Sequence, residues 1–272
     1  MKSIRAGKIQ YLEPKSFAGT GVSIQGFTTR HEGVSRPPYN SLNLGLNTFD
    51  NPHHVEGNRS ILVRNFSTDL DRLVTVNQVH GDDILVIDEP NPDYSHFLKL
   101  ECDGIVTNQP GVMIGICVAD CFPVLLLDPV RRVAAALHAG WKGTAAGITK
   151  KGVEALVKLF DSDPRDILAA VGPGIGPCCY EVDAPVMEDF RKSGQDCSLF
   201  FEERGEGKFR LDLSGANYQQ LLWAGVPEGN IEIEKLCVSC TRELFFSYRR
   251  DSGETGRQMG FIMLKEESKF CR

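Results

Sequence analysis

The sequence lacks an apolar run long enough to cross a bilayer. Its longest apolar runs, residues 111–118 and 123–129, are separated by Asp120 and fall short of the roughly 20 residues that a spanning helix needs. The opening residues MKSIRAGKIQYLEP also contain no apolar segment of the kind found in secretory signals. We therefore expect a cytoplasmic protein that makes no membrane contact.

An excess of positive charge is missing as well. The 272 residues include 30 Lys and Arg against 36 Asp and Glu, which gives a formal net charge of −6. Proteins that bind nucleic acid usually carry a basic surface, so we expect no nucleic-acid partner. The sequence also lacks heptads, fixed-period repeats and a Pro-, Ser- or Gly-rich linker. We therefore interpret residues 1–272 as one domain.

The nine cysteines are an odd number, and no export signal accompanies them. This combination favours a reducing compartment in which thiols stay free or bind metal. The sequence CVSC at 237–240 has the C-x-x-C form, but a zinc ribbon needs four ligands and no second C-x-x-C is present. We therefore expect neither structural zinc nor redox chemistry there, and we interpret Cys178 and Cys179 as reduced core thiols.

Runs rich in Val, Ile and Leu and bounded by Gly, Pro and Asp predict strands that are buried on both faces. Residues 1–70 read as short strands and turns, with SLNLGLNTFDN as a polar loop. Helical spacing of apolar residues predicts helices at 144–160, 183–193 and 212–224. Strands are expected at 73–79, 83–88, 111–120, 123–128, 132–138, 167–171 and 257–264. Strands mixed with peripheral helices predict an α/β or α+β layered fold.

Three metal-capable residues each lie at the end of a predicted strand. His80 ends TVNQVH, Cys121 follows CVAD, and His138 ends AAALH. A site can open where strands end, so these side chains could meet. Two imidazoles and a thiolate suit Zn²⁺ and leave a fourth position open. Two alternatives remain: the histidines can be ordinary half-buried side chains, or Cys121 can be a nucleophile with His138 as its base.

Two glycine-rich segments could border such a site. HAGWKGT (138–144) opens a predicted helix, whose unpaired N–H groups together with Lys142 would attract an anion, although the spacing is not that of a P-loop. The alternative is a tight turn with Trp141 as packing. GPGIG (172–176) is not a dinucleotide motif, because Pro177 follows it; it is either a loop that lines a site or a structural turn.

Charged residues in or beside polar loops are further candidates, each against the alternative of an ordinary turn or solvated side chain. Asp103 in ECDG could orient a histidine or move a proton, or it could simply form a turn. Several arginines at such positions could bind an anionic ligand: Arg30, Arg59, Arg249, Arg250 and Arg257.

Taken together, the ordered motifs resemble one family over nearly the whole chain. It is the YfiH-type family, long labelled laccase-like or multicopper polyphenol oxidase. The motifs that carry the resemblance are GVSRPPYNSLNLG (33–45), TVNQVHG (75–81), CDGIVTNQPGV (102–112), VADCFPVLLLDP (118–129), AALHAGWKGT (135–144), GPGIGPCCYEV (172–182) and FFSYRRDSGETGRQMGFI (245–262).

The resemblance implies a single-domain α/β/β/α layered sandwich, which is an α+β fold with mixed sheets flanked by helices. It also implies a metal bound by His80, Cys121 and His138, with Zn²⁺ expected and copper as the alternative. The implied activity is phosphorolysis of purine nucleosides (adenosine, inosine, guanosine and methylthioadenosine), together with adenosine deamination. Bacterial members are also linked to editing of peptidoglycan precursors, and copper-dependent phenol oxidation is the older label.

Chemistry helps to weigh these activities. An oxidase with several copper centres needs many histidines, and the chain has six, so we disfavour laccase chemistry. Zinc lowers the pKa of its water to about 7, which suits attack on C6 of adenine. Phosphorolysis needs an anion site, which we place near Arg59 and Lys142. It also needs a proton for the leaving purine, which we assign to Asp103 or to a zinc-bound water.

We therefore predict a zinc-dependent purine nucleoside phosphorylase that also deaminates adenosine. The alternatives are a hydrolase of cell-wall precursors that uses Cys121 and His138, a copper-dependent polyphenol oxidase and a metal-binding regulator without catalysis. The residues expected in catalysis are Cys121, His138, Asp103 and Arg59, and those expected to contact substrate or phosphate are Asn43, Lys142, Arg249 and Arg250.

Overall fold

Two six-stranded sheets packed face to face form the centre of the molecule. The computed structural model describes residues 1–90 and 94–266. One sheet has the order β1 (Lys2–Ala6), β2 (Ile9–Glu13), β3 (Ser23–Thr28), β15 (Gln258–Leu264), β7 (Met113–Val118), β4 (Leu73–Val74). The other has the order β14 (Ile231–Ile233), β10 (Leu168–Val171), β8 (Phe122–Asp128), β9 (Val133–Ala139), β6 (Gly104–Thr107), β5 (Ile84–Ile87).

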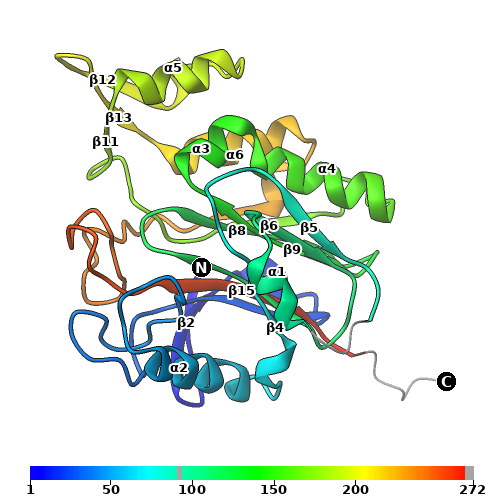
Figure 1. The fold of residues 1–272 in the computed structure, drawn as a ribbon. Coiled ribbons are helices and arrows are strands. Elements are labelled where there is room, and N and C mark those ends of the chain that lie inside the picture. Colours follow the sequence, from blue (N-terminus) through cyan, green and yellow to red (C-terminus); the bar gives the residue numbers. More distant parts are fainter. Residues whose placement is uncertain (91–93, 267–272) are drawn as a thin grey trace.

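Helices cover the outer face of each sheet, which gives the α/β/β/α layering seen in Figure 1. Helix α2 (Pro52–Asn65) lies below the first sheet, and α3 (Trp141–Ala146), α4 (Ile148–Phe160) and α6 (Leu213–Trp223) lie above the second. The short helix α1 (Lys15–Ala18) contacts β3. Parallel and antiparallel pairs occur together in both large sheets. The predicted α+β class is confirmed.

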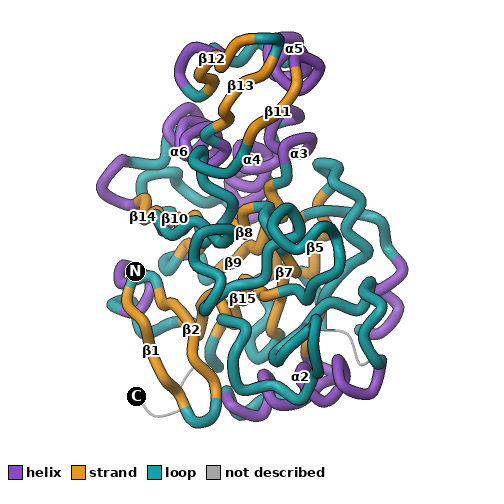
Figure 2. Tube along the Cα trace, turned by 90° about the vertical axis from the view of Figure 1, so that its left-hand side faces the viewer, coloured by secondary structure: helices purple, strands orange, loops and turns teal. Residues whose placement is uncertain are grey.

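A small third sheet projects from one end of the molecule (Figure 2). It has the order β11 (Glu181–Asp183), β13 (Lys208–Leu211), β12 (Phe201–Gly205), and α5 (Ala184–Lys192) packs beside it. Among the described residues, 3₁₀ turns occupy Leu70–Arg72, Ser95–Lys99, Cys197–Leu199 and Glu228–Asn230. No helix within residues 1–90 and 94–266 combines the length and the apolar character that crossing a membrane requires.

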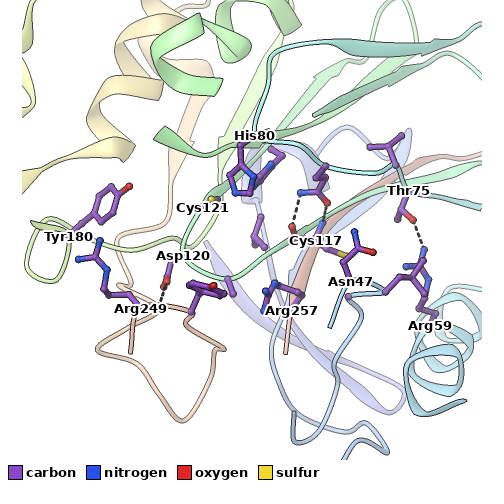
Figure 3. A pocket seen from close by; sticks show the side chains of 18 residues that line it. Asn47, Arg59, Thr75, His80, Cys117, Asp120, Cys121, Tyr180, Arg249 and Arg257 are labelled. Atoms are coloured by element: carbon purple, nitrogen blue, oxygen red, sulfur yellow. Dashed lines mark hydrogen bonds between the residues drawn. The ribbon is translucent and has the colours of Figure 1, made fainter. Parts of the chain in front are cut away.

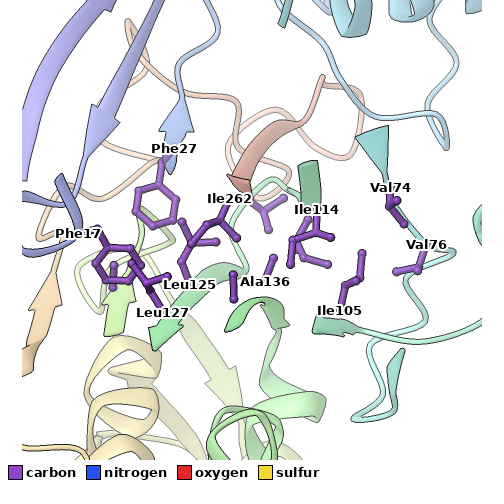
Figure 4. Close-up of a cluster of buried hydrophobic side chains, with 14 of the residues drawn as sticks. Phe17, Phe27, Val74, Val76, Ile105, Ile114, Leu125, Leu127, Ala136 and Ile262 are labelled. Atoms are coloured by element: carbon purple, nitrogen blue, oxygen red, sulfur yellow. The ribbon is translucent and has the colours of Figure 1, made fainter. Parts of the chain in front are cut away.

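The central strands β8 and β9 are buried along their whole length, as their unbroken apolar sequences predict. Successive side chains of a strand point to opposite faces. Leu125 and Ala136 therefore face the first sheet, whereas Leu126 and Leu137 belong to the core under the helices. Figure 4 shows Phe27, Ile114 and Ile262 of the first sheet packed toward Leu125 and Ala136.

Most predicted elements are present, with three corrections. The helix predicted at 144–160 is divided into α3 and α4 by Gly147, whose φ of +88° interrupts the helical path. The strand predicted at 73–79 is limited to Leu73–Val74. Residues 1–70, interpreted as strands and turns only, also contain the 14-residue helix α2.

Helix α2 was missed because its inward face is partly polar. Its buried side chains include Asn58 and Arg59 beside Val55 and Leu62, so the apolar spacing that indicates a helix is broken. The signal that could have found it is the start: Asn51 caps the helix by accepting a hydrogen bond from the backbone N–H of His53 at 3.0 Å, and Pro52 occupies the first position.

Candidate active site

His80, Cys121 and His138 meet at one end of the second sheet. Their possible ligand atoms all lie within 4.8 Å of one another, and the two imidazole centroids are 4.7 Å apart. The strand pairing explains the meeting. Because Phe122 pairs with Ala139 and Pro123 with His138, the turn that contains Cys121 lies beside the end of β9. The structure therefore brings together the three residues that the sequence singled out.

His80 reaches the cluster from a turn rather than from a strand end. Its φ of +63° places it in the left-handed region, which non-glycine residues seldom occupy outside special turns. Asp120, which precedes Cys121, has a φ of +92°. Its carboxylate accepts hydrogen bonds from the Ser247 hydroxyl and the Arg249 backbone N–H, both at 2.6 Å. These contacts hold the turn that carries Cys121.

Asp103 orients two of the three cluster residues. One carboxylate oxygen lies 2.6 Å from Nδ1 of His138, and the carboxylate also accepts the backbone N–H groups of Val79, His80 and Gly81 at 3.2, 2.9 and 2.6 Å. Nδ1 of His138 is thus engaged, which leaves Nε2 for the cluster. Asp103 is fully buried and is not among the residues that line the cavity.

Charge coupling favours a thiolate at Cys121. Burial opposes its ionisation, but the neighbouring His138 and His80 lower the pKa of Cys121 to about 6. Burial likewise disfavours a charged His138, yet Cys121 and Asp103 raise the pKa of His138 to about 9. This coupling favours the thiolate of Cys121, which is the form of cysteine that binds metals or attacks an electrophile.

The residues present fit a zinc ion. The donor set is two imidazoles and one thiolate, which suits zinc and leaves one tetrahedral position open. Gly140 packs directly against the cluster: a Cβ there would lie 3.0 Å from Cδ2 of His80 and 3.1 Å from Sγ of Cys121. The remaining histidines, His31, His53, His54 and His96, belong to no group of three or more metal-capable side chains in the described part of the chain, so they provide no set of additional copper centres.

All three cluster residues line a cavity of about 530 Å³ between the two sheets' ends and the surrounding loops. Figure 3 shows Arg59, Arg249, Arg257 and Tyr180 arranged around it with the cluster at one wall. Besides the cluster, the side chains that give the cavity its polar and aromatic character are Asn47, Arg59, Thr75, Gln78, Asp120, Tyr180, Tyr248, Arg249 and Arg257.

Two arginines of this cavity, the buried Arg59 and the half-buried Arg257, have no carboxylate partner within residues 1–90 and 94–266. Arg59 is 5% exposed and donates to the Leu44 carbonyl at 3.2 Å and the Thr75 hydroxyl at 2.7 Å. Arg257 donates to the carbonyls of Thr255 and Gly256. Neither forms an ion pair with a carboxylate among the described residues, and burial lowers the pKa of both. Buried cations are costly unless paired, so the cavity favours an anionic ligand.

Arg249 and Tyr180 form another part of the cavity wall. The Arg249 guanidinium lies 5.3 Å from the centroid of the Tyr180 ring and donates to the Glu181 carbonyl at 3.1 Å. Burial and the negative charge of Cys121 raise the pKa of Tyr180, which keeps its hydroxyl protonated and able to donate. Arg257 similarly lies 5.5 Å from the ring centroid of Tyr248.

Two residues expected at the substrate, Asn43 and Lys142, do not line the cavity. Asn43 is fully buried and bonds to Thr48, Asp50 and the backbone N–H groups of Gly45 and Arg257, so it supports Arg257 from behind. Lys142 is exposed on the six-residue helix α3 and does not line the cavity. The predicted phosphate site required Lys142 to lie near Arg59, and the structure does not bring these two residues together.

Arg250 points away from the cavity. It donates to the carbonyls of Val238 and Phe245 and pairs with Asp251 at 2.7 Å. Arg30, the other arginine named from the sequence, donates to the carbonyls of Asn40 and Arg242 and also lies outside the cavity. Both hold loops in place, and of the five candidate arginines the cavity contains Arg59, Arg249 and Arg257.

Sequence reasoning did not single out several cavity residues: Asn47, Thr75, Gln78, Cys117, Asp120, Tyr180 and Tyr248. Most of them fall inside the motifs quoted above, which was the available signal. Gln78 shows why type alone was insufficient. Its side-chain amide donates to the Cys117 carbonyl at 2.8 Å and accepts the Cys117 backbone N–H at 2.9 Å. Gln78 therefore fixes the segment before His80 to β7.

The chain is similar over most of its length to proteins of known family. A family model described as "Multi-copper polyphenol oxidoreductase laccase" matches residues 24–265. "Purine nucleoside phosphorylase YlmD" of Geobacillus stearothermophilus is 39% identical over 257 residues, 92% of each chain. "Purine nucleoside phosphorylase YfiH" of Escherichia coli is 38% identical over 256 residues, 94% of this chain and 97% of that one.

Solved structures agree with these matches. The crystal structure of the Bacillus licheniformis hypothetical protein YfiH is 40% identical, covers 97% of this chain and 99% of its own, and has a TM-score of 0.89. The crystal structure of YlmD from Geobacillus stearothermophilus is 37% identical, covers 97% and 98%, and has a TM-score of 0.88. The resemblance stated from the motifs is confirmed.

Proposed function

The chain belongs to the family described as multi-copper polyphenol oxidoreductase laccase, and from this premise we propose that it catalyses phosphorolysis of purine nucleosides in the cavity beside His80, Cys121 and His138. The names of its relatives support an enzyme of the purine nucleoside phosphorylase type. The finer parts of the proposal are a bound Zn²⁺, the substrates adenosine, inosine, guanosine and methylthioadenosine, and a second activity as an adenosine deaminase.

The observation that carries the proposal is that the buried Arg59 and the half-buried Arg257 line the same cavity as the metal-capable cluster. Guanidinium groups bind phosphate through paired N–H donors. Of the five N–H groups that each guanidinium offers, the bonds to neighbouring carbonyls and hydroxyls engage only some. An inorganic phosphate would supply an anionic partner, which neither arginine has among the described residues. This placement replaces the one that relied on Lys142.

The rest of the cavity suits a nucleoside. Its volume of about 530 Å³ lies within the 300–1,000 Å³ typical of small-molecule sites. The rings of Tyr180 and Tyr248 offer faces for a purine, and the Asn47 amide offers hydrogen bonds for a ribose. In phosphorolysis a phosphate oxygen forms a bond to C1′ while the bond from C1′ to the purine nitrogen breaks. Arg59 and Arg257 would hold the phosphate in position for that attack.

The leaving purine takes the electron pair of the broken bond and needs a proton or a hydrogen-bond donor. Asp103 was the residue assigned to this step from the sequence, but it is buried, held by His138, and has its pKa lowered by His138 and backbone N–H groups against the effect of burial. We assign it instead to positioning His138. The protonated Tyr180 hydroxyl faces the cavity and is the donor we propose for the purine.

His80, Cys121 and His138 would hold the zinc ion. Zinc bound there would supply Lewis acidity, which is the chemistry that hydrolytic deamination of adenosine requires. Asp103 would keep the Nδ1 proton of His138 in place and so present Nε2 to the ion.

The test is to incubate the purified protein with adenosine and phosphate and to identify the products by chromatography. We expect adenine and ribose 1-phosphate, with inosine or hypoxanthine where deamination also occurs. Replacing Arg59→Met should raise the phosphate KM roughly 10–100-fold, since a charge-assisted hydrogen bond contributes about 1.5–3 kcal/mol. Arg64→Met, on an exposed face of the same helix, is the matched control. An unchanged phosphate KM in both Arg59→Met and Arg257→Met would contradict the phosphate site.

A second candidate function rests on one specific observation. Cys121 interacts with His138, which in turn bonds to Asp103. This is the arrangement of nucleophile, base and orienting carboxylate found in cysteine hydrolases. Such an enzyme, for example one acting on cell-wall precursors, would keep its activity when a strong chelator removes metal. Loss of activity on chelation, restored by added zinc, would contradict it.

A further inference from the structure

A second group of sulfur atoms lies outside the cavity. Cys178 and Cys179 follow the GPGIGP turn, and Cys237 and Cys240 belong to CVSC. In the folded chain their four Sγ atoms all lie within 4.8 Å of one another. We name these residues the four-cysteine cluster. Cys178 and Cys240 are exposed, so the interpretation of Cys178 as a core thiol was wrong. Cys179 is half-buried and packs against the core between the two sheets.

The distances fit one tetrahedrally coordinated ion. With a Zn–S distance of about 2.3 Å, the sulfurs of a tetrathiolate site lie about 3.8 Å apart. The Sγ atom of Cys240 is 3.7 Å from that of Cys178 and 3.4 Å from that of Cys179. These separations are well beyond the roughly 2.05 Å of a disulfide bond, and all eight cysteines of the described residues are free thiols.

The backbone around Cys237 is arranged to stabilise a thiolate. The N–H of Gly176 donates to Sγ of Cys237 at 3.2 Å. Hydrogen bonds of this kind orient and tune metal-bound sulfur. Gly176 also permits the approach of the two segments, because a Cβ there would lie 3.2 Å from Cβ of Cys237 and 3.3 Å from Sγ of Cys178.

We propose that Cys178, Cys179, Cys237 and Cys240 bind one structural Zn²⁺, separate from the cluster in the cavity. Four S–H groups lose their protons to solvent and four Zn–S bonds form, with no change of oxidation state. Four protein ligands leave no open position, which is the mark of a structural rather than a catalytic zinc site. The inference does not depend on the proposed phosphorolysis, since it rests on side chains that do not line the cavity.

The position of the four-cysteine cluster suggests what the ion would do. It would join residues 172–183 to residues 237–250, two segments far apart in the sequence that already share the bridge between Gly174 and Cys237. The N–H of Val238 donates to the Gly174 carbonyl at 3.0 Å. Tyr180 follows the first cysteine pair and Arg249 follows the second, and both line the cavity. The ion would therefore fix one wall of the cavity without touching the substrate.

The experiment measures metal content of the purified full-length protein by elemental analysis. We expect two zinc ions per chain in the unaltered protein. The double variant Cys178→Ser/Cys240→Ser should retain one, and so should His80→Ala, whereas combining all three substitutions should leave none. Cys197→Ser is the matched control: this half-buried free thiol lies in neither cluster and its variant should keep both ions.

A spectroscopic measurement keeps the test informative if a variant binds metal weakly. In Co²⁺-substituted His80→Ala protein, the remaining site should show the intense sulfur-to-cobalt absorption of four thiolates, and Cys178→Ser/Cys240→Ser should abolish it. We also expect the double variant to have a several-fold higher nucleoside KM and a smaller decrease in kcat. The reason is that the segments carrying Tyr180 and Arg249 would no longer be joined by the ion.

Three results would overturn the proposal. The first is an unchanged zinc content in Cys178→Ser/Cys240→Ser. The second is a disulfide between Cys240 and Cys178 or Cys179 in protein purified and alkylated without reductant. The third is the visible absorption of a ferric tetrathiolate in freshly purified protein, which would make iron the resident ion instead of zinc.

Discussion

At the residue scale, the candidate site depends on how charges are balanced where water is excluded. Asp103 is buried with its carboxylate fully used by His138 and three backbone N–H groups. Arg59 and Arg257, by contrast, lie in the cavity wall and form no ion pair with a carboxylate in the described part of the chain. A buried charged group whose hydrogen bonds are all made within the protein holds the fold in place. A charged group without an oppositely charged neighbour favours the binding of a ligand of opposite charge. The two kinds of residue are therefore assigned to positioning and to binding.

Replacing Asp103→Asn should weaken zinc binding in the cavity roughly 10–100-fold, because the carboxylate that orients His138 acts as its outer partner. Competition against a zinc indicator measures the affinity, in a Cys178→Ser/Cys240→Ser background so that one site is observed. Asp82→Asn, a nearby carboxylate that pairs with Lys151 at the surface, is the control and should leave the affinity unchanged. Equal affinity in the Asp103 variant and the parent would contradict the positioning role.

A pH-dependent contribution to stability is expected from Asp251. Burial opposes its ionisation, but Arg250 and the Thr255 hydroxyl hold its pKa below the ordinary value. A pKa that is lower in the folded than in the unfolded protein stabilises the fold above the unfolded value of about 3.9, and this contribution is lost as the pH falls through the folded pKa.

Asp251→Asn should therefore lower the free energy of unfolding by about 1–2 kcal/mol at pH 7, and the difference from the parent should shrink as the pH falls from 5 toward 3. Urea unfolding at a series of pH values measures it. The exposed Asp69 provides the control variant Asp69→Asn. A difference that stays constant or grows at low pH would argue against the ion pair as its source.

At the scale of elements, helix α2 connects local structure with the site. Its start is fixed by the Asn51 cap and by Pro52, and its inward face carries Arg59 to the cavity. The same face presents Asn58, whose side-chain amide donates to the Ser41 and Asn43 carbonyls at 3.1 and 2.9 Å. The helix therefore organises the polar loop before it while it delivers the guanidinium. These two roles explain why polar residues lie on the inward face of α2.

Asn51→Ala should cost about 1 kcal/mol of unfolding free energy, because the first turn of α2 loses its side-chain cap. Asn51→Asp retains an acceptor and should restore most of the stability. Urea denaturation of both variants measures the effect, and phosphate KM should rise in Asn51→Ala if fraying reaches Arg59. Equal stability of the alanine and aspartate variants would show that the cap does not hold the helix.

At the scale of the whole molecule, the two large sheets share one core. Leu125 and Ala136 of the second sheet pack with Ile114 and Ile262 of the first, so neither sheet can expose that face alone without losing apolar burial. This shared core supports the interpretation of residues 1–272 as one domain, which stays a prediction. It also sets the distance between β7 and β8, whose connection carries Asp120 and Cys121.

Calorimetry should show one unfolding transition for the zinc-loaded protein. Leu125→Ala should lower the free energy of unfolding by about 2–5 kcal/mol, because it removes a fully buried side chain from the shared core. Leu159→Ala, at a leucine of α4 that is 58% exposed, is the control and should change little. Two separate transitions, with only one affected by Leu125→Ala, would contradict the one-domain interpretation.

The sequence by itself determined the elements whose apolar pattern is strong and the residues whose chemistry is distinctive. β8, β9 and α5 follow from unbroken or periodic apolar residues, and His80, Cys121 and His138 were chosen by type and by position next to strands. Motif order was sufficient to identify the family. These features are local, or carried by ordered motifs, and so they can be read along the chain.

Tertiary structure alone decided which residues of ordinary type face the cavity and which cysteines meet. Arg59 and Arg257 line the cavity whereas Arg250 and Lys142 do not, although the three arginines looked alike beside polar loops and Lys142 was an equal candidate at a helix start. Cys178 and Cys179 meet Cys237 and Cys240 across about 60 residues of sequence because Gly174 pairs with Cys237. Hydrogen bonds between segments that are remote in sequence set the distances between these residues. The amino-acid pattern within one segment does not indicate which other segment it pairs with.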